Sequence, residues 1–136
     1  MRRAAIVAPV RTPVAKFLGS LQSVPVEELA ATVVRATIER AGLDPARIDD
    51  VVFAQSYANG ETPCVGRWAA LQAGLPIEVP GMQLDRRCGG GLQAIATAAA
   101  RSSTGTAWRE PRNFATGVLT GATIAALRIA ILFRPV

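Results

Sequence analysis

GMQLDRRCGGGLQAIATAA, residues 81–99, places a short apolar segment, a glycine-rich turn and a helical pattern in immediate succession. Residues 81–84 predict a short strand that leads directly into the turn at Cys88 and residues 89–91. Beyond the turn, apolar positions recur at the spacing of an amphipathic helix, namely Leu92, Ile95, Ala96 and Ala99. The segment is therefore typical of a strand–turn–helix unit in an α/β protein.

Two more units of this kind precede it. Residues 4–8 and 51–54 are short apolar runs that predict buried strands. Residues 26–41 and 63–73 show helical spacing, and Gly42 stands where a C-terminal glycine cap belongs. The first hundred residues therefore predict the order β-α-β-α-β-α, an α/β fold of layered sheet and helices with at least partly parallel strands.

The pattern changes near Ala100. Residues 101–136 contain scattered arginines and a diffuse apolar run without clean periodicity, which predicts an irregular C-terminal tail. We therefore expect two parts, residues 1–100 as a partial α/β domain and residues 101–136 as the tail. Three strands make a thin sheet, and its uncovered edge predicts poor solubility or oligomerisation.

The composition excludes several kinds of catalytic site. Of the 136 residues, 50% are hydrophobic and 18% are charged, so we expect a packed core. Histidine is absent, which excludes a Ser-His-Asp triad, a Cys-His dyad and a His-ligated metal site within this chain. A reaction that needs an imidazole base must take it from another chain or segment.

Charge and cysteine usage limit the partners and the compartment. The net charge of +5 divides into +1 for residues 1–100 and +4 for residues 101–136, so no organised basic face is expected and no nucleic-acid partner. The uncharged residues 113–127 are shorter than the ~20 residues that span a bilayer, so we expect no membrane partner. Two cysteines without a CxxC motif, and no secretory segment, favour the reducing cytoplasm.

Cys88 is the candidate nucleophile. It follows two arginines at a strand-to-helix turn, where free backbone N–H groups and the helix dipole favour a thiolate. Gly89, Gly90 and Gly91 allow a substrate to approach the backbone closely, and their N–H groups could hold an oxyanion. The alternative is that Cys88 is only a small residue at a tight turn. Cys64 is more typical of a packing residue.

Four ordered blocks also resemble one enzyme family. QLDRRCGGGLQAI at residues 83–95 resembles the nucleophile segment of thiolases, the acetyl-CoA acetyltransferases and 3-ketoacyl-CoA thiolases. The blocks at residues 8–17, 43–51 and 66–76 resemble the family's opening strand and loop, its approach to the second strand and its next helix. Together they extend over residues 3–100.

The resemblance implies a reaction and an assembly. Cys88 would take an acyl group from an acyl-CoA thioester, and a second thioester or free CoA would react in a second step. The outcome is Claisen condensation of acetyl-CoA or thiolysis of a 3-ketoacyl-CoA, as in fatty acid metabolism. Coenzyme A thioesters are then substrates, with no permanently bound cofactor. The family's fold is two similar α/β halves packed in layers, and its members assemble as dimers or tetramers. A homo-oligomer, or pairing with a thiolase subunit, is therefore expected.

Several departures from the family define three hypotheses. The family's basic histidine and second catalytic cysteine have no counterpart here, and Gly90 replaces a common serine. The first hypothesis is a truncated thiolase N-terminal part that is inactive alone, with residues 101–136 produced by a change of reading frame or a real terminus. The second is a non-catalytic interaction module that pairs with a full-length thiolase. The third retains stoichiometric acylation of Cys88.

Overall fold

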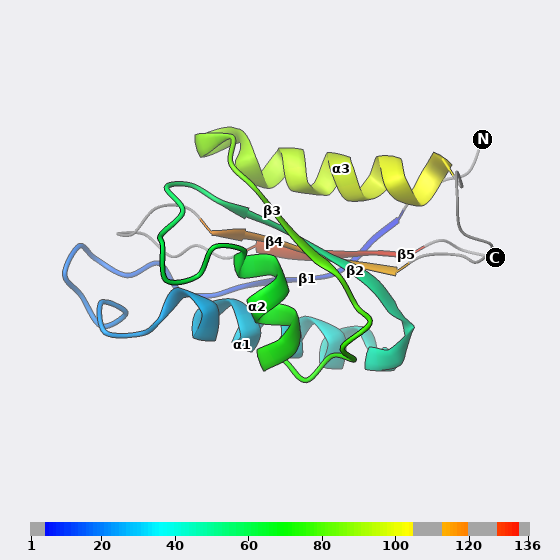
Figure 1. The fold of residues 1–136 in the computed structure, drawn as a ribbon, viewed down its shortest axis with the longest axis horizontal. Helices are drawn as coiled ribbons and strands as arrows, with labels where there is room; N and C mark the ends of the chain where they lie inside the picture. The colour runs from blue at the N-terminus through cyan, green and yellow to red at the C-terminus, as the bar shows by residue number, and fades with distance from the viewer. Residues whose placement is uncertain (1–4, 105–112, 120–127, 134–136) are drawn as a thin grey trace.

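A five-stranded sheet with helices on both faces forms the molecule (Figure 1). The structure is a computed structural model that describes residues 5–104, 113–119 and 128–133. Helix α3 covers one face of the sheet, and helices α1 and α2 cover the other (Figure 1). In chain order the elements are β1 (Ala5–Arg11), α1 (Val26–Ala41), η1 (Pro45–Arg47), β2 (Ile48–Gln55), α2 (Val65–Gln72), β3 (Gly81–Leu84), η2 (Arg87–Gly89), α3 (Gly90–Thr104), β4 (Asn113–Leu119) and β5 (Arg128–Phe133). The predicted α/β class and the predicted order of strands and helices, here β1-α1-β2-α2-β3-α3, are confirmed.

Strand β2 is the centre of the fold. Its side chains alternate between two clusters because successive residues of a strand point to opposite faces. Val51 and Phe53 pack with α1 and α2 in the larger cluster. Val52 and Ala54 pack with residues of α3 in the smaller one. Burial on both faces, with parallel partners on both edges, is the environment expected for a central strand of an α/β sheet.

Helix α1 forms as its sequence pattern predicts. Its first turn carries Glu27 and Glu28, which favour the positive end of the helix dipole. Gly42 ends the helix in the left-handed conformation, with φ of 63°, and its N–H donates to the carbonyls of Ile38 and Glu39. Its predicted apolar stripe is buried, at Ala30, Val33, Val34, Thr37 and Ile38.

The C-terminal residues correct the prediction of an irregular tail. Helix α3 continues past residue 100 to Thr104, and β4 and β5 both join the sheet. The strand order is β1-β5-β4-β2-β3: β4 runs parallel to β2, and β5 runs antiparallel to both β4 and β1. The physical reason lies in the N–H and C=O groups along the second edge of β2, which need partners that β3 does not supply.

Strand β1 depends on the C-terminal residues for its place in the sheet. It pairs with β5 and not with β2, and the register shifts between Val7 and Val10. Within this shift Ala8 has a positive φ of 48°, a conformation typical of an irregularity in a strand. The division into residues 1–100 and 101–136 stays a prediction, although strands from both parts share one sheet.

Candidate active site

Cys88 lies at the carboxyl end of the parallel strands. It belongs to η2, the short 3-10 turn between β3 and α3, and its side chain is exposed. Strands β2, β3 and β4 are parallel, so their carboxyl ends meet at the same edge of the sheet. In open α/β sheets ligands bind beyond this edge. The predicted strand-to-helix position of Cys88 is therefore present in the structure.

Two of the N–H groups that the sequence suggests as oxyanion donors already donate to backbone carbonyls within η2. The N–H of Gly89 donates to the carbonyl of Arg86 at 3.0 Å. The N–H of Gly90 donates to the carbonyl of Arg87. An oxyanion beside Cys88 would need other donors in this conformation, or an opening of the turn. The oxyanion role of residues 89–91 stays a prediction.

Gly90 has a packing role that Gly89 does not share. A Cβ at position 90 would lie 3.1 Å from the Cβ of Ala54, closer than side-chain carbons normally approach. A Cβ at position 89 would meet only the flexible side chain of Arg86, at 3.8 Å. Glycine at position 90 thus lets the first turn of α3 approach the end of β2.

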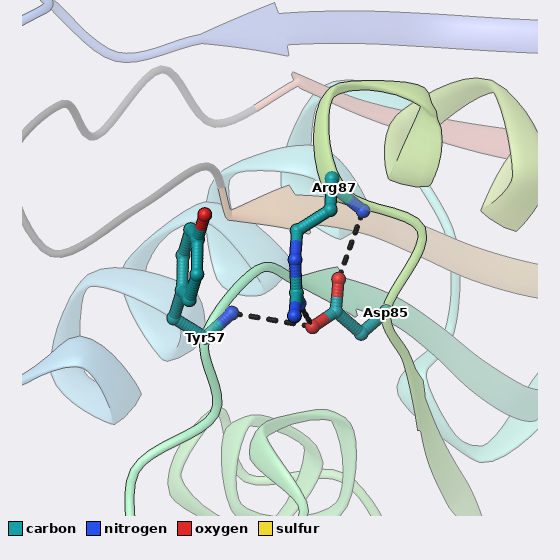
Figure 2. Close-up of polar contacts among 3 residues, drawn as sticks. All are labelled: Tyr57, Asp85 and Arg87. Atoms are coloured by element: carbon teal, nitrogen blue, oxygen red, sulfur yellow. Dashed lines mark hydrogen bonds and ion pairs between the residues drawn. The ribbon is translucent and has the colours of Figure 1, made fainter.

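Asp85 joins the turn at Cys88 to the loop after β2 (Figure 2). Its Oδ1 accepts from the backbone N–H of Arg87 at 2.8 Å, and its Oδ2 accepts from the backbone N–H of Tyr57 at 3.3 Å. The Arg87 guanidinium also pairs with Oδ2 and lies over the Tyr57 ring, 4.3 Å from the ring centroid. No local sequence pattern indicates Tyr57, because it is 28 residues away from Asp85.

Further contacts fix the elements on either side. The Arg86 guanidinium donates to Oε1 of Gln93 in the first turns of α3. Gln83 on β3 accepts the N–H of Val65 at 2.7 Å, which caps the start of α2. Strand β3 is thereby tied to α2 on one side, and its following turn is tied to α3 on the other.

The two cysteines are free thiols at opposite ends of β3. Sγ of Cys64 lies 3.5 Å from the carbonyl oxygen of Gly81, the first residue of β3, whereas Cys88 follows the last. This contact agrees with a packing role for Cys64. Within the described ranges, no three His, Cys, Asp or Glu side chains gather as metal ligands would. No helix in that part of the chain is long and apolar enough to cross a membrane.

An exposed cysteine at a strand-to-helix turn of a layered α/β fold is a candidate catalytic nucleophile. Residues 4–108 match the family described as "Thiolase, N-terminal domain". The chain belongs to the thiolase family.

Relatives and solved structures agree with this assignment. The chain is 43% identical over 95 residues to an acetyl-CoA acetyltransferase of Pseudomonas aeruginosa. The aligned stretch covers 70% of this chain and 24% of the relative. It is 41% identical over 109 residues to a beta-ketoadipyl-CoA thiolase of Acinetobacter baylyi, covering 79% and 27%. The crystal structure of the Bacillus anthracis acetyl-CoA acetyltransferase superposes with a TM-score of 0.80 at 32% identity, over 87% of this chain and 29% of that one.

The matches cover a small part of each relative and most of this chain. The chain spans about a quarter of the length of the curated relatives that it matches. The structural match covers 87% of the chain, a larger share than residues 1–100 provide, so it extends beyond residue 100.

Proposed function

We propose that this chain carries the nucleophilic cysteine of an acyl-CoA acyltransferase and that Cys88 accepts the acyl group. The observation that supports the proposal is the exposed thiol at the carboxyl end of three parallel strands, within the segment that matches the family. The thiolate of Cys88 attacks the thioester carbonyl, so a new C–S bond forms. The C–S bond to coenzyme A breaks, and the CoA thiolate leaves and takes up the proton that Cys88 lost.

The second half of the reaction needs an acid–base group outside this chain. The family resemblance assigns activation of the nucleophilic cysteine to a histidine. It assigns proton transfer at the substrate carbon, as the acyl group passes to a second acetyl-CoA or to free CoA, to a second cysteine or histidine. The chain contains no histidine, and Cys64 lies at the far end of β3. We therefore propose acylation of Cys88 without turnover by this chain alone, with coenzyme A thioesters as substrates.

The test is the intact mass of the protein after incubation with acetyl-CoA. We expect one acetyl group on the unaltered chain and on Cys64→Ala, and none on Cys88→Ala. Cys64→Ala is the matched control because it removes the other thiol. An adduct that persists in Cys88→Ala, or no adduct on any form, would refute the proposal.

Pairing with a thiolase subunit is the second candidate function. Among the described strands, β3 lies at one edge of the sheet, and its four residues are half-buried. An edge strand offers unpaired N–H and C=O groups to another chain. Size-exclusion chromatography with light scattering, alone and with a full-length acetyl-CoA acetyltransferase, tests this. A monomer that does not bind the acetyltransferase would contradict the candidate.

The proposed compartment is the cytoplasm, where reducing conditions keep Cys64 and Cys88 as thiols. Fatty acid metabolism is the corresponding proposal for the pathway. Labelling of the thiols in intact cells, before and after reduction, tests the compartment: a Cys64 or Cys88 that reacts only after reduction would contradict it.

A further inference from the structure

Arg87, which directly precedes Cys88, and Tyr57, whose ring the Arg87 guanidinium covers, both adopt the left-handed backbone conformation. Arg87 has φ of 47° and Tyr57 has φ of 58°. L-residues with side chains rarely adopt this conformation, because Cβ approaches the following carbonyl oxygen. Strained residues of this kind persist when surrounding contacts hold them, and they cluster at functional sites.

One carboxylate holds both strained residues. The backbone N–H of Arg87 donates to Oδ1 of Asp85, and the backbone N–H of Tyr57 donates to Oδ2 of the same side chain. Tyr57 follows the end of β2, and Asp85 follows the end of β3, so the carboxylate links the carboxyl ends of two parallel strands. Figure 2 shows these two bonds, with the Arg87 guanidinium between the carboxylate and the Tyr57 ring.

The position of Arg87 in the chain makes this linkage relevant to Cys88. The backbone dihedral angles of Arg87 set the direction in which the next residue, Cys88, leaves the turn. The ion pair between Arg87 and Asp85 is partly exposed, with side-chain exposures of 57% and 31%, so its contribution to overall stability is small. Its effect is local, on the geometry of η2.

We propose that Asp85 is a positioning residue for Cys88. By accepting from Arg87 and Tyr57, it holds the turn so that the Cys88 thiolate faces the incoming thioester carbonyl. The proposal rests on the proposed function, because the orientation matters only when Cys88 is the attacking group. Tyr57 contributes through its backbone N–H and through its ring beneath the Arg87 guanidinium.

The test compares two reactions of the same thiol in Asp85→Ala. Attack on acetyl-CoA needs a defined direction, whereas alkylation by iodoacetamide, a small and freely diffusing reagent, does not. We expect acetylation of Cys88 to fall about tenfold to a hundredfold, and alkylation to stay within about twofold of the unaltered chain. Acetylation within about twofold of that of the unaltered chain, or alkylation that falls together with acetylation, would overturn the proposal.

Two further variants sharpen the test. Asp44→Ala is the matched control, because Asp44 also accepts a backbone N–H two residues further on, that of Ala46 at 2.9 Å. We expect it to leave acetylation unchanged. Asp85→Asn retains one acceptor oxygen, so we expect a rate between those of Asp85→Ala and the unaltered chain. An Asp85→Asn variant as slow as Asp85→Ala would contradict the hydrogen bonds as the cause.

Amide hydrogen exchange separates this proposal from the proposed function. If the unaltered chain takes no acetyl group, the function fails, and exchange at Tyr57 and Arg87 still tests the linkage. We expect both amides to exchange faster in Asp85→Ala and not in Asp44→Ala. Unchanged exchange at both amides would overturn the proposal, whatever the outcome with acetyl-CoA.

Discussion

Helix α2 lies close against the start of β3 at Gly81, and Gly81→Ala perturbs this contact directly. A Cβ at position 81 would lie 2.5 Å from the backbone nitrogen of Arg67 and 2.6 Å from its Cα. It would also lie 2.6 Å from the carbonyl carbon of Gly66. All three atoms belong to the backbone of α2, so no side-chain rotation relieves the contact.

The magnitude follows from the separation that the methyl group requires. Ordinary van der Waals contact begins near 3.4 Å, so β3 and α2 must separate by about 1 Å. Overpacking of this kind costs about 1–3 kcal/mol, and rigid backbone on both sides favours the upper end. Replacing glycine by alanine in a strand recovers about 0.5–1 kcal/mol. We expect a net loss of about 2 kcal/mol, which lowers Tm by about 8 °C in a chain of this size.

The assay is thermal and urea unfolding followed by circular dichroism, with Gly60→Ala as the control. A Cβ at position 60 would meet nothing within 4 Å, so we expect a change within about 0.5 kcal/mol. A Gly81→Ala chain as stable as the control would refute the close approach of α2 to β3. It would also remove the reason for glycine at Gly66, where a Cβ would collide with the carbonyl oxygen of Met82.

Three further predictions concern other contacts. Gly90→Ala should lower stability by about 1 kcal/mol because of its contact with β2, whereas Gly89→Ala should change it by less than about 0.5 kcal/mol; Tm values of the two variants decide this. Arg101→Ala should lower the free energy of unfolding by about 2 kcal/mol, because it removes the ion pair at 2.8 Å with the buried carboxylate of Asp50. A double-mutant cycle with Asp50→Asn, measured by urea unfolding, should show that the two residues are coupled. Thr62→Val should cost about 1 kcal/mol, because the buried hydroxyl donates at 3.0 Å to a carboxylate in the first turn of α1, and the urea midpoint should fall with an unchanged slope.

The elements that the sequence predicts correctly are those fixed by local chemistry. Two acidic residues mark the start of helix α1 and Gly42 marks its end, and its stripe of apolar residues indicates which face is buried. Residues 81–84 are predicted as a strand with the bounds that the structure gives, because an apolar run meets a glycine-rich turn. In both cases the deciding residues lie within a few positions of one another.

The sequence does not predict strands β4 and β5, because the evidence for them is not local. The sequence of β5, RIAILF, is rich in β-branched and large apolar residues and could have suggested a strand. Its place between β1 and β4 depends on pairings with residues far away in the chain, at Ala5–Arg11 and at Asn113–Leu119. Periodicity within a window of residues contains no information on such pairings.

The candidate site divides in the same way. The position of Cys88 at a strand-to-helix turn follows from its own neighbours in sequence. The link from Asp85 to Tyr57 does not, because it joins the ends of two strands and requires a positive φ at residues that are not glycine. The use of the Gly89 and Gly90 N–H groups within η2 depends on dihedral angles that the glycine-rich sequence leaves open.

The geometry around Cys88 depends on β2 more than on β3, the strand that precedes the cysteine. Strand β3 has four half-buried residues and one partner strand among those described, so it is a weak support. Strand β2 is buried on both faces. Near its end, Ala54 faces Gly90 of α3, and just beyond its end the N–H of Tyr57 donates to Asp85. Substitutions at the end of β2 should therefore alter the geometry of the turn at Cys88, although no residue of β2 belongs to the glycine-rich segment.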